Sequence, residues 1–250
     1  MFCQTGCDQW LMSIRTHLPH LSKPQAIVLA LWSFGMGLAR SCALTAVSTL
    51  LAAGLQRKDY TVRQQVRAWC YEVTAKQGVQ RCALQVETCC APLLAWVLSE
   101  WQGTQLAVAL DATTLGTRFV VVALSVVSRG CAIPVAWAIL PAGAKQAWRG
   151  TWSRLRRRRR PAVPKGWTVL VLAARGLYAP WLLQRMVRLG WPPFLRLNTG
   201  GTFRPAGTPC FRPLATFAPR GGTCWQGRGT AFKSRGSQLE WTLLARWEAD

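Results

Sequence analysis

Acidic residues are scarce in this chain. Its 250 residues include 9 Asp and Glu against 31 Lys and Arg, for a formal net charge of +22. The imbalance is strongest in the C-terminal part, where Asp111 is the one acidic residue between Trp101 and Leu239. A compact domain with this charge repels itself unless a polyanion neutralises it. Nucleic acid is therefore the expected partner, and an anionic membrane surface is the alternative.

The residue spacing of a zinc site is also missing. The sequence has two histidines, His17 and His20, and none of its 10 cysteines forms a Cys-x-x-Cys pair. This excludes the common zinc modules, which need clustered Cys and His ligands. The first ten residues lack the apolar segment of a secretory signal peptide. We therefore expect a cytoplasmic protein with reduced cysteines, most of them small core residues.

Uninterrupted apolar runs of membrane-spanning length are absent. Ala26–Leu55 is strongly apolar, but Arg40 divides it into pieces shorter than the roughly 20 residues that cross a bilayer. Phe119–Ala144 contains Arg129-Gly130 and Pro134, which suit a hairpin between two buried strands better. We expect no membrane span.

Residues 1–103 are expected to form a helical region. Half of the whole chain is hydrophobic, which is enough for a substantial core. The sequence Ser22-Lys23-Pro24 is typical of a helix start. Basic helix edges are compatible with DNA binding, but no helix-turn-helix signature is present, so a packed helical domain is the simpler interpretation. The predicted helices span residues 25–39, 41–53, 61–76 and 84–101.

Residues 104–198 change to a pattern of strands and helices. Their order, three strands, a helix, a strand, a helix and a strand, predicts a mixed sheet with flanking helices, an α/β fold. The second and third strands should form a hairpin through Arg129-Gly130. The predicted strands span 106–111, 118–128, 131–140, 167–173 and 193–197, and the helices span 147–160 and 178–189.

Residues 199–250 are rich in Gly, Pro, Thr and Arg. Short strands are predicted at 213–217, 224–226 and 239–247. The chain then stops without a terminating helix, so we expect an incomplete β-rich segment.

Asp111 is the main candidate for a functional side chain. It ends the apolar run Leu106–Leu110, and a charge in a buried strand is costly unless it is paired or holds a metal ion. In so basic a region, a metal ligand or an ion-pair anchor in a polyanion site is one interpretation. The other is an Asp that caps the next turn, with Thr113 and Thr114 as turn residues. Spacing alone does not decide between them.

Four segments resemble a known family. The succession LDATTLG, VVVALSVVSRGCAIPVAWAILP, WTVLVLAARGLY and RLGWPPFLRLNTGGTFRPAG resembles the insertion-sequence transposases of the Asp-Asp-Glu type, in the group named after insertion sequence four. The region from Trp10 to Leu98 also resembles the helical part of those proteins. The resemblance implies a ribonuclease-H-like core in which three carboxylates hold two Mg²⁺ ions for DNA cleavage and strand transfer. It also implies transposon-end DNA as the partner, and a homodimer or a heterodimer with a full-length transposase.

The sequence departs from the family at two of the three acidic positions. Asp111 matches the first carboxylate, which favours a catalytic metal ligand over a turn cap. The second carboxylate would precede Arg175-Gly176, where this chain has Ala174. The late helix with the third, in a Tyr-x-x-Arg-x-x-x-Glu pattern, is not found. A single carboxylate holds Mg²⁺ weakly, so we expect a truncated, catalytically defective copy; the alternative is a non-catalytic DNA-binding regulator of a full-length transposase.

Arginines supply the candidate DNA contacts. The five consecutive arginines Arg156 to Arg160 could equally form a solvated helix end, where cations interact favourably with the helix dipole. Basic residues spaced through the glycine-rich C-terminal part, Lys233 and Arg235 among them, suit contacts to the DNA backbone without base readout. The residues assigned to DNA binding are Arg156, Arg157, Arg158, Arg159, Arg160, Arg175 and Arg204.

Overall fold

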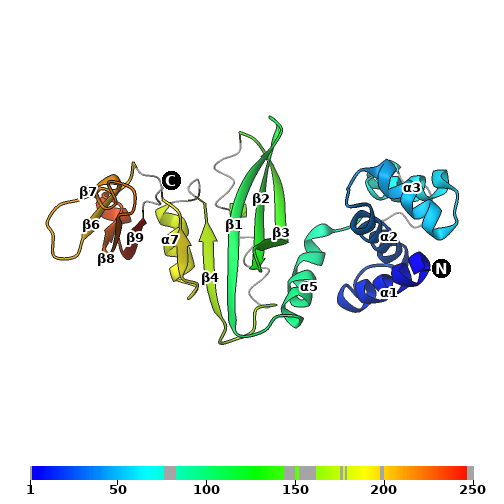
Figure 1. Cartoon of the computed structure of the whole chain (residues 1–250), viewed down its shortest axis with the longest axis horizontal. Coiled ribbons are helices and arrows are strands. Elements are labelled where there is room, and N and C mark those ends of the chain that lie inside the picture. Colours follow the sequence, from blue (N-terminus) through cyan, green and yellow to red (C-terminus); the bar gives the residue numbers. More distant parts are fainter. Residues whose placement is uncertain are drawn as a thin grey trace. The chain divides into compact units, whose positions relative to one another are not determined.

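The chain divides into two compact units, Met1–Trp101 and Gln102–Asp250. The first is helical and the second contains two β-sheets (Figure 1). This mixed α/β architecture confirms the broad fold class expected from the sequence. The structure, a computed structural model, describes residues 2–75, 83–143, 150–151, 162–174, 177, 179–197 and 200–246.

The helical unit follows the predicted pattern closely. Four of its helices match predicted ones, with α4 ending at Trp69 instead of residue 76, and the helix α1 was not predicted. The elements are α1 (Phe2–His17), α2 (Lys23–Ala39), α3 (Leu44–Leu55), α4 (Asp59–Trp69), the 3₁₀ turn η1 (Val73–Ala75) and α5 (Val86–Ser99).

Apolar side chains of these helices pack against one another inside the unit. One buried cluster joins Cys7 of α1 and Leu31 of α2 to α3 and α4. A second joins α1 to α2 around Ile14 and Ala26. Among the described residues no single helix is long and apolar enough to cross a membrane. Taken as a pair, α2 and α3 reach the required length and apolar composition, but the chain bends by 98° between them.

The start of α2 carries a capping box that can be tested. The Ser22 hydroxyl accepts a hydrogen bond from the Gln25 backbone N–H, and the Ser22 N–H donates to the Gln25 side chain at 2.9 Å. We expect Ser22→Ala to lower the free energy of unfolding by about 1 kcal/mol, because the Gln25 backbone N–H at the start of the helix loses its acceptor. Urea unfolding followed by circular dichroism measures this loss. Ser99→Ala, at an exposed helix end, is the control and should change stability by less than about 0.5 kcal/mol; equal losses would contradict the capping role.

The larger sheet of the second unit has the strand order β3-β2-β1-β4-β5. β2 runs antiparallel to β1 and β3, whereas β4 is parallel to β1 and β5 is parallel to β4. The mixed sheet predicted from the sequence is therefore confirmed. Its strands are β1 (Gln105–Leu115), β2 (Phe119–Ser128), β3 (Cys131–Pro141), β4 (Thr168–Ala173) and β5 (Pro193–Leu195).

The hairpin between β2 and β3 is also confirmed. Ser128 pairs with Cys131, which leaves a two-residue turn. Arg129 and Gly130 both have positive φ angles, 48° and 79°. This is the backbone geometry that suits the twist of a tight hairpin.

One face of this sheet is buried. Leu106, Val108 and Leu110 of β1 are buried and pair with Val169, Val171 and Ala173 of β4, which are buried as well. The helix α7 (Pro180–Val187) follows β4 and ends shortly before Gly190, as predicted. Of the predicted helix at 147–160, only 150–151 are described, and these two are helical. Side chains alternate along a strand, so the residues between the buried ones lie on the opposite face.

A smaller antiparallel sheet, in the order β7-β6-β8-β9, forms the C-terminal part. Its core is built around Phe203, Phe217 and Leu243. The strand predicted at 213–217 was wrong beyond its first residue: Pro213 pairs with Thr202, the Leu214 N–H donates to the Gly201 carbonyl at 2.9 Å, and the chain then enters a 3₁₀ turn. β6 was not predicted, and β8 is longer than predicted. The elements are β6 (Thr202–Pro205), β7 (Arg212–Pro213), η4 (Leu214–Thr216), β8 (Cys224–Ala231), η5 (Arg235–Ser237) and β9 (Leu239–Arg246).

Candidate functional site

Asp111 lies inside a long strand, not at its end. β1 continues to Leu115, and Thr113 and Thr114 pair with residues of β2. The turn-cap interpretation of Asp111 is therefore wrong. The reason is that the two neighbours of β1 end at different points: pairing with β2 continues to Leu115, whereas parallel pairing with β4 stops at Leu110. Asp111 is thus at the strand end only with respect to β4.

The end of β4 lies directly beside Asp111. Leu110 pairs with Ala173 in the parallel register, so the next residues along the two strands are Asp111 and Ala174. Both are exposed, whereas Leu110 and Ala173 are buried. Adjacent strands are about 4.8 Å apart, and alternation puts Asp111 on the sheet face opposite the buried one, whereas Ala174 follows the last residue of β4. The resemblance to the transposases requires positions 111 and 174 to lie at the ends of neighbouring strands, and the pairing of β1 with β4 agrees with that requirement.

Among the described residues, the groups nearest to Asp111 in the sheet are uncharged. The Thr113 hydroxyl donates a hydrogen bond of 2.7 Å to Asp111 Oδ2. Across the sheet, Asp111 pairs with Ala123 of β2, and Ala123 pairs with Trp137 of β3. Trp137 is 36% exposed. This part of the sheet therefore presents one carboxylate, the Thr113 hydroxyl that orients it, and the exposed part of the Trp137 ring.

These residues do not fit a two-metal centre. Such a centre needs several oxygen ligands for each hard cation. The sequence has no acid between Asp111 and Glu240, and Glu240 accepts a hydrogen bond from Thr230 within the small sheet. In the part of the chain that the structure describes, no group of three or more His, Cys, Asp or Glu side chains could hold a metal ion. The methyl group of Ala174 supplies no ligand.

Of the arginines assigned to DNA binding, only Arg204 can be located. Its Nη2 donates a 3.1 Å hydrogen bond to the Thr230 hydroxyl, and its guanidinium carbon lies 5.1 Å from the centre of the Phe211 ring. Thr230 donates in turn to Glu240 at 2.7 Å. Arg204 thus helps to join β6, β8 and β9, and its further N–H donors remain for another acceptor. Arg156, Arg157, Arg158, Arg159, Arg160 and Arg175 lie outside the described residues.

A histidine and a cysteine meet in the helical unit, but they do not form an activated nucleophile. His20 Nε2 is 3.4 Å from Cys89 Sγ. Burial raises the pKa of the Cys89 thiol above its ordinary value. A raised pKa keeps the thiol protonated at neutral pH, whereas a reactive cysteine needs the thiolate. This pair is best explained as packing between α5 and the loop before α2.

The strand ends therefore present one carboxylate, the hydroxyl that donates to it, and a methyl group where a second ligand would be needed. These groups alone support no metal-dependent reaction. No protein family and no curated protein gives a match to this sequence.

Proposed function

We propose that this chain is a relative of the Asp-Asp-Glu transposases of the insertion-sequence-four group, with a ribonuclease-H-like core, and that it binds DNA without cutting or joining it. The observation that carries the proposal is the register of β1 and β4, which brings Asp111 beside position 174. Two neighbouring parallel strands are what such a core requires, because carboxylates at their ends must reach the same metal ions.

The loss of catalysis follows from the side chain at position 174. In the resemblance described above, this position supplies the second carboxylate. An alanine methyl cannot coordinate a cation, and Asp111 alone provides too few oxygen ligands. Position 174 is exposed. The packing of the sheet therefore does not explain why an alanine stands where the family has an acidic residue.

DNA binding rests on the exposed basic side chains of the second unit. In the described parts of this unit, exposed cations lie on both sheets and their connections, and the exposed acids are Asp111 and Glu240. Such a surface attracts phosphates irrespective of base sequence. The exposed basic residues are Arg118, Arg129, Lys165, Arg188, Arg196, Arg212, Arg220, Arg228, Lys233, Arg235 and Arg246.

A chain that binds transposon DNA without cutting it would compete with an active transposase for the same ends. This is the regulatory alternative, in which the chain acts alone or in a heterodimer. Ala174 favours this regulatory role over an active enzyme, because an alanine removes a metal ligand and leaves the basic surface unchanged.

Incubation with terminal-repeat DNA tests the proposal. We expect a gel-shifted complex and no nicked product in Mg²⁺ or Mn²⁺, because one carboxylate cannot assemble the metal site. The Asp111→Asn variant is the control, and it should bind DNA within about twofold of the unmodified chain, since phosphate contacts come from cations. Metal-dependent nicking that Asp111→Asn abolishes would overturn the inactivity, and failure to bind DNA at low salt would overturn the proposal as a whole.

A further inference from the structure

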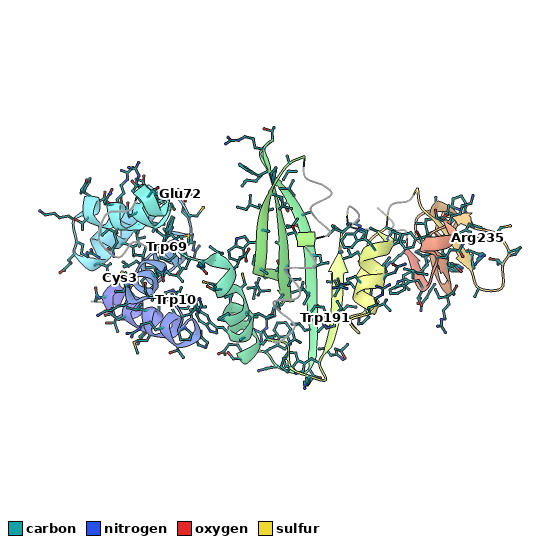
Figure 2. All side chains as sticks on the ribbon, turned by 180° about the vertical axis from the view of Figure 1, so that it is seen from behind. Cys3, Trp10, Trp69, Glu72, Trp191 and Arg235 are labelled. Carbon is teal, nitrogen blue, oxygen red and sulfur yellow. The ribbon has the colours of Figure 1, made fainter. Side chains whose placement is uncertain are left out.

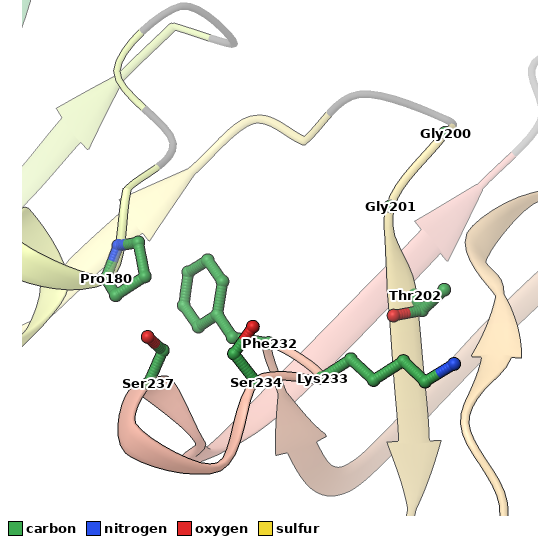
Figure 3. Close-up of a pocket in the computed structure, with 8 residues that line it drawn as sticks. All are labelled: Pro180, Gly200, Gly201, Thr202, Phe232, Lys233, Ser234 and Ser237. Carbon is green, nitrogen blue, oxygen red and sulfur yellow. The ribbon is translucent and has the colours of Figure 1, made fainter.

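A pocket of about 260 Å³ opens beside the small sheet. Thr202 of β6 and Gly200–Gly201 before it form one wall, and the segment after β8 forms the other. Figure 3 shows the Phe232 ring directed toward Pro180 and the Lys233 side chain extended in the opposite direction. None of the residues that line this pocket is acidic.

The polar groups of the pocket are an ammonium and hydroxyls. Lys233 supplies the one charge, and Thr202, Ser234 and Ser237 supply hydroxyls. Ser234 precedes η5, yet its side chain makes no capping hydrogen bond. Within the described residues, none of these three hydroxyls has a side-chain hydrogen bond. The Lys233 ammonium extends away from Ser234 and Ser237 (Figure 3), so the pocket offers its charge and its hydroxyls from different sides. Such a lining suits a ligand that is anionic and has several acceptor oxygens.

The loop that carries these groups is held in place by its own hydrogen bonds. Phe232 has a left-handed φ of 65°, which turns the chain directly after β8. The Gln238 side-chain N–H donates to the Lys233 carbonyl at 3.2 Å, and the Ser237 N–H donates to the Ser234 carbonyl at 2.8 Å. A loop fixed before the ligand arrives loses less entropy on binding.

We infer that this pocket binds a phosphate group, separately from the strand ends at Asp111. A phosphate matches the donors because it carries negative charge and accepts several hydrogen bonds at once. Phe232 and Pro180 add an apolar wall that suits the sugar of a nucleotide. The inference rests on the proposed function for its source, a backbone phosphate of bound DNA; a free nucleotide or inorganic phosphate carries the same chemistry.

Lys233→Gln and Arg235→Gln form a matched pair. Both side chains are exposed and each variant loses one positive charge, but only Lys233 lines the pocket; Arg235 is labelled in Figure 2. With a fluorescent DNA duplex at low salt, we expect Lys233→Gln to weaken binding about tenfold, because it loses a charge-assisted contact. Its slope of log affinity against log salt should fall by about 0.9. Arg235→Gln should weaken binding less, by about threefold, because Arg235 adds to the general positive charge of the surface but does not line the pocket.

A second variant and a second probe make the result decisive. Ser237→Glu adds a carboxylate to the pocket wall, so it should also weaken DNA binding about tenfold. Inorganic phosphate should shift the NMR amide signals of Lys233 and Ser234 in the unmodified chain and not in Ser237→Glu. Thermal melting followed by circular dichroism checks that each variant is folded.

The possible outcomes separate the pocket from the proposed function. Equal losses of DNA affinity in Lys233→Gln and Arg235→Gln would overturn phosphate binding in the pocket, because the general positive charge of the surface would then explain both losses. DNA binding that neither Lys233→Gln nor Ser237→Glu affects would also overturn the pocket and would leave DNA binding intact. Phosphate binding at these amides in a chain that does not bind DNA would support the pocket, with a free phosphate or nucleotide as its ligand, and would overturn the proposed function.

Discussion

Raising the salt concentration from 50 to 200 mM should weaken DNA binding by about a thousandfold. The physical reason is that each Lys or Arg in contact with a phosphate releases a condensed counterion from the DNA. The exposed cations of the second unit outnumber its exposed acids in the described residues. If six or more of them contact phosphates, the affinity should fall by about this factor over this salt range.

Fluorescence anisotropy of a labelled duplex across this salt range measures the effect. An unrelated duplex of equal length should show a similar slope, because phosphate contacts carry no sequence information. The Arg228→Gln variant, which loses an exposed cation of β8, should reduce the slope by about 0.9 if this side chain contacts a phosphate. An affinity that does not depend on salt would remove the electrostatic basis of the proposed function.

The larger sheet could be predicted from sequence because its signals are local. The residues Arg129 and Gly130 of the tight turn have positive φ angles, and the two strands that the turn joins are apolar, with β-branched residues frequent in β2. β4 is an apolar segment bounded by turn residues, and Gly190, which follows α7, also has a positive φ. The adjacency of β1 and β4 was inferred from the family resemblance, and the parallel register bears it out.

Other features depend on long-range pairing that no local pattern indicates. β1 extends past Asp111 because β2 continues to pair with it, and a charged residue followed by Thr113 and Thr114 is equally typical of a turn. β6 is short, and it pairs with β8, which begins about twenty residues further along the chain. The pocket combines Thr202 with Lys233 and Ser237, which are about thirty residues further along. In the sequence, Lys233 is one of several basic residues scattered through the C-terminal part.

The strongest test of the site geometry is the substitution Ala174→Asp. We expect it to raise the affinity for Mn²⁺ at least about tenfold, because two carboxylates would then lie on neighbouring strands and could share one cation. Electron paramagnetic resonance of free Mn²⁺ during a protein titration measures the affinity. The expectation follows from the parallel register, in which Asp111 and position 174 come directly after the pair Leu110 and Ala173.

Two further variants distinguish shared coordination from added charge. Ala215→Asp puts the same charge at an exposed position of η4, and it should leave the Mn²⁺ affinity within about twofold of the original, because an isolated exposed carboxylate binds weakly. Asp111→Asn combined with Ala174→Asp should remove the gain, since one of the two ligands is lost. If Ala174→Asp and Ala215→Asp have equal effects, the strand ends do not form a common site. The ribonuclease-H-like interpretation would then lose its main support, because that core depends on both strand ends reaching the same ions.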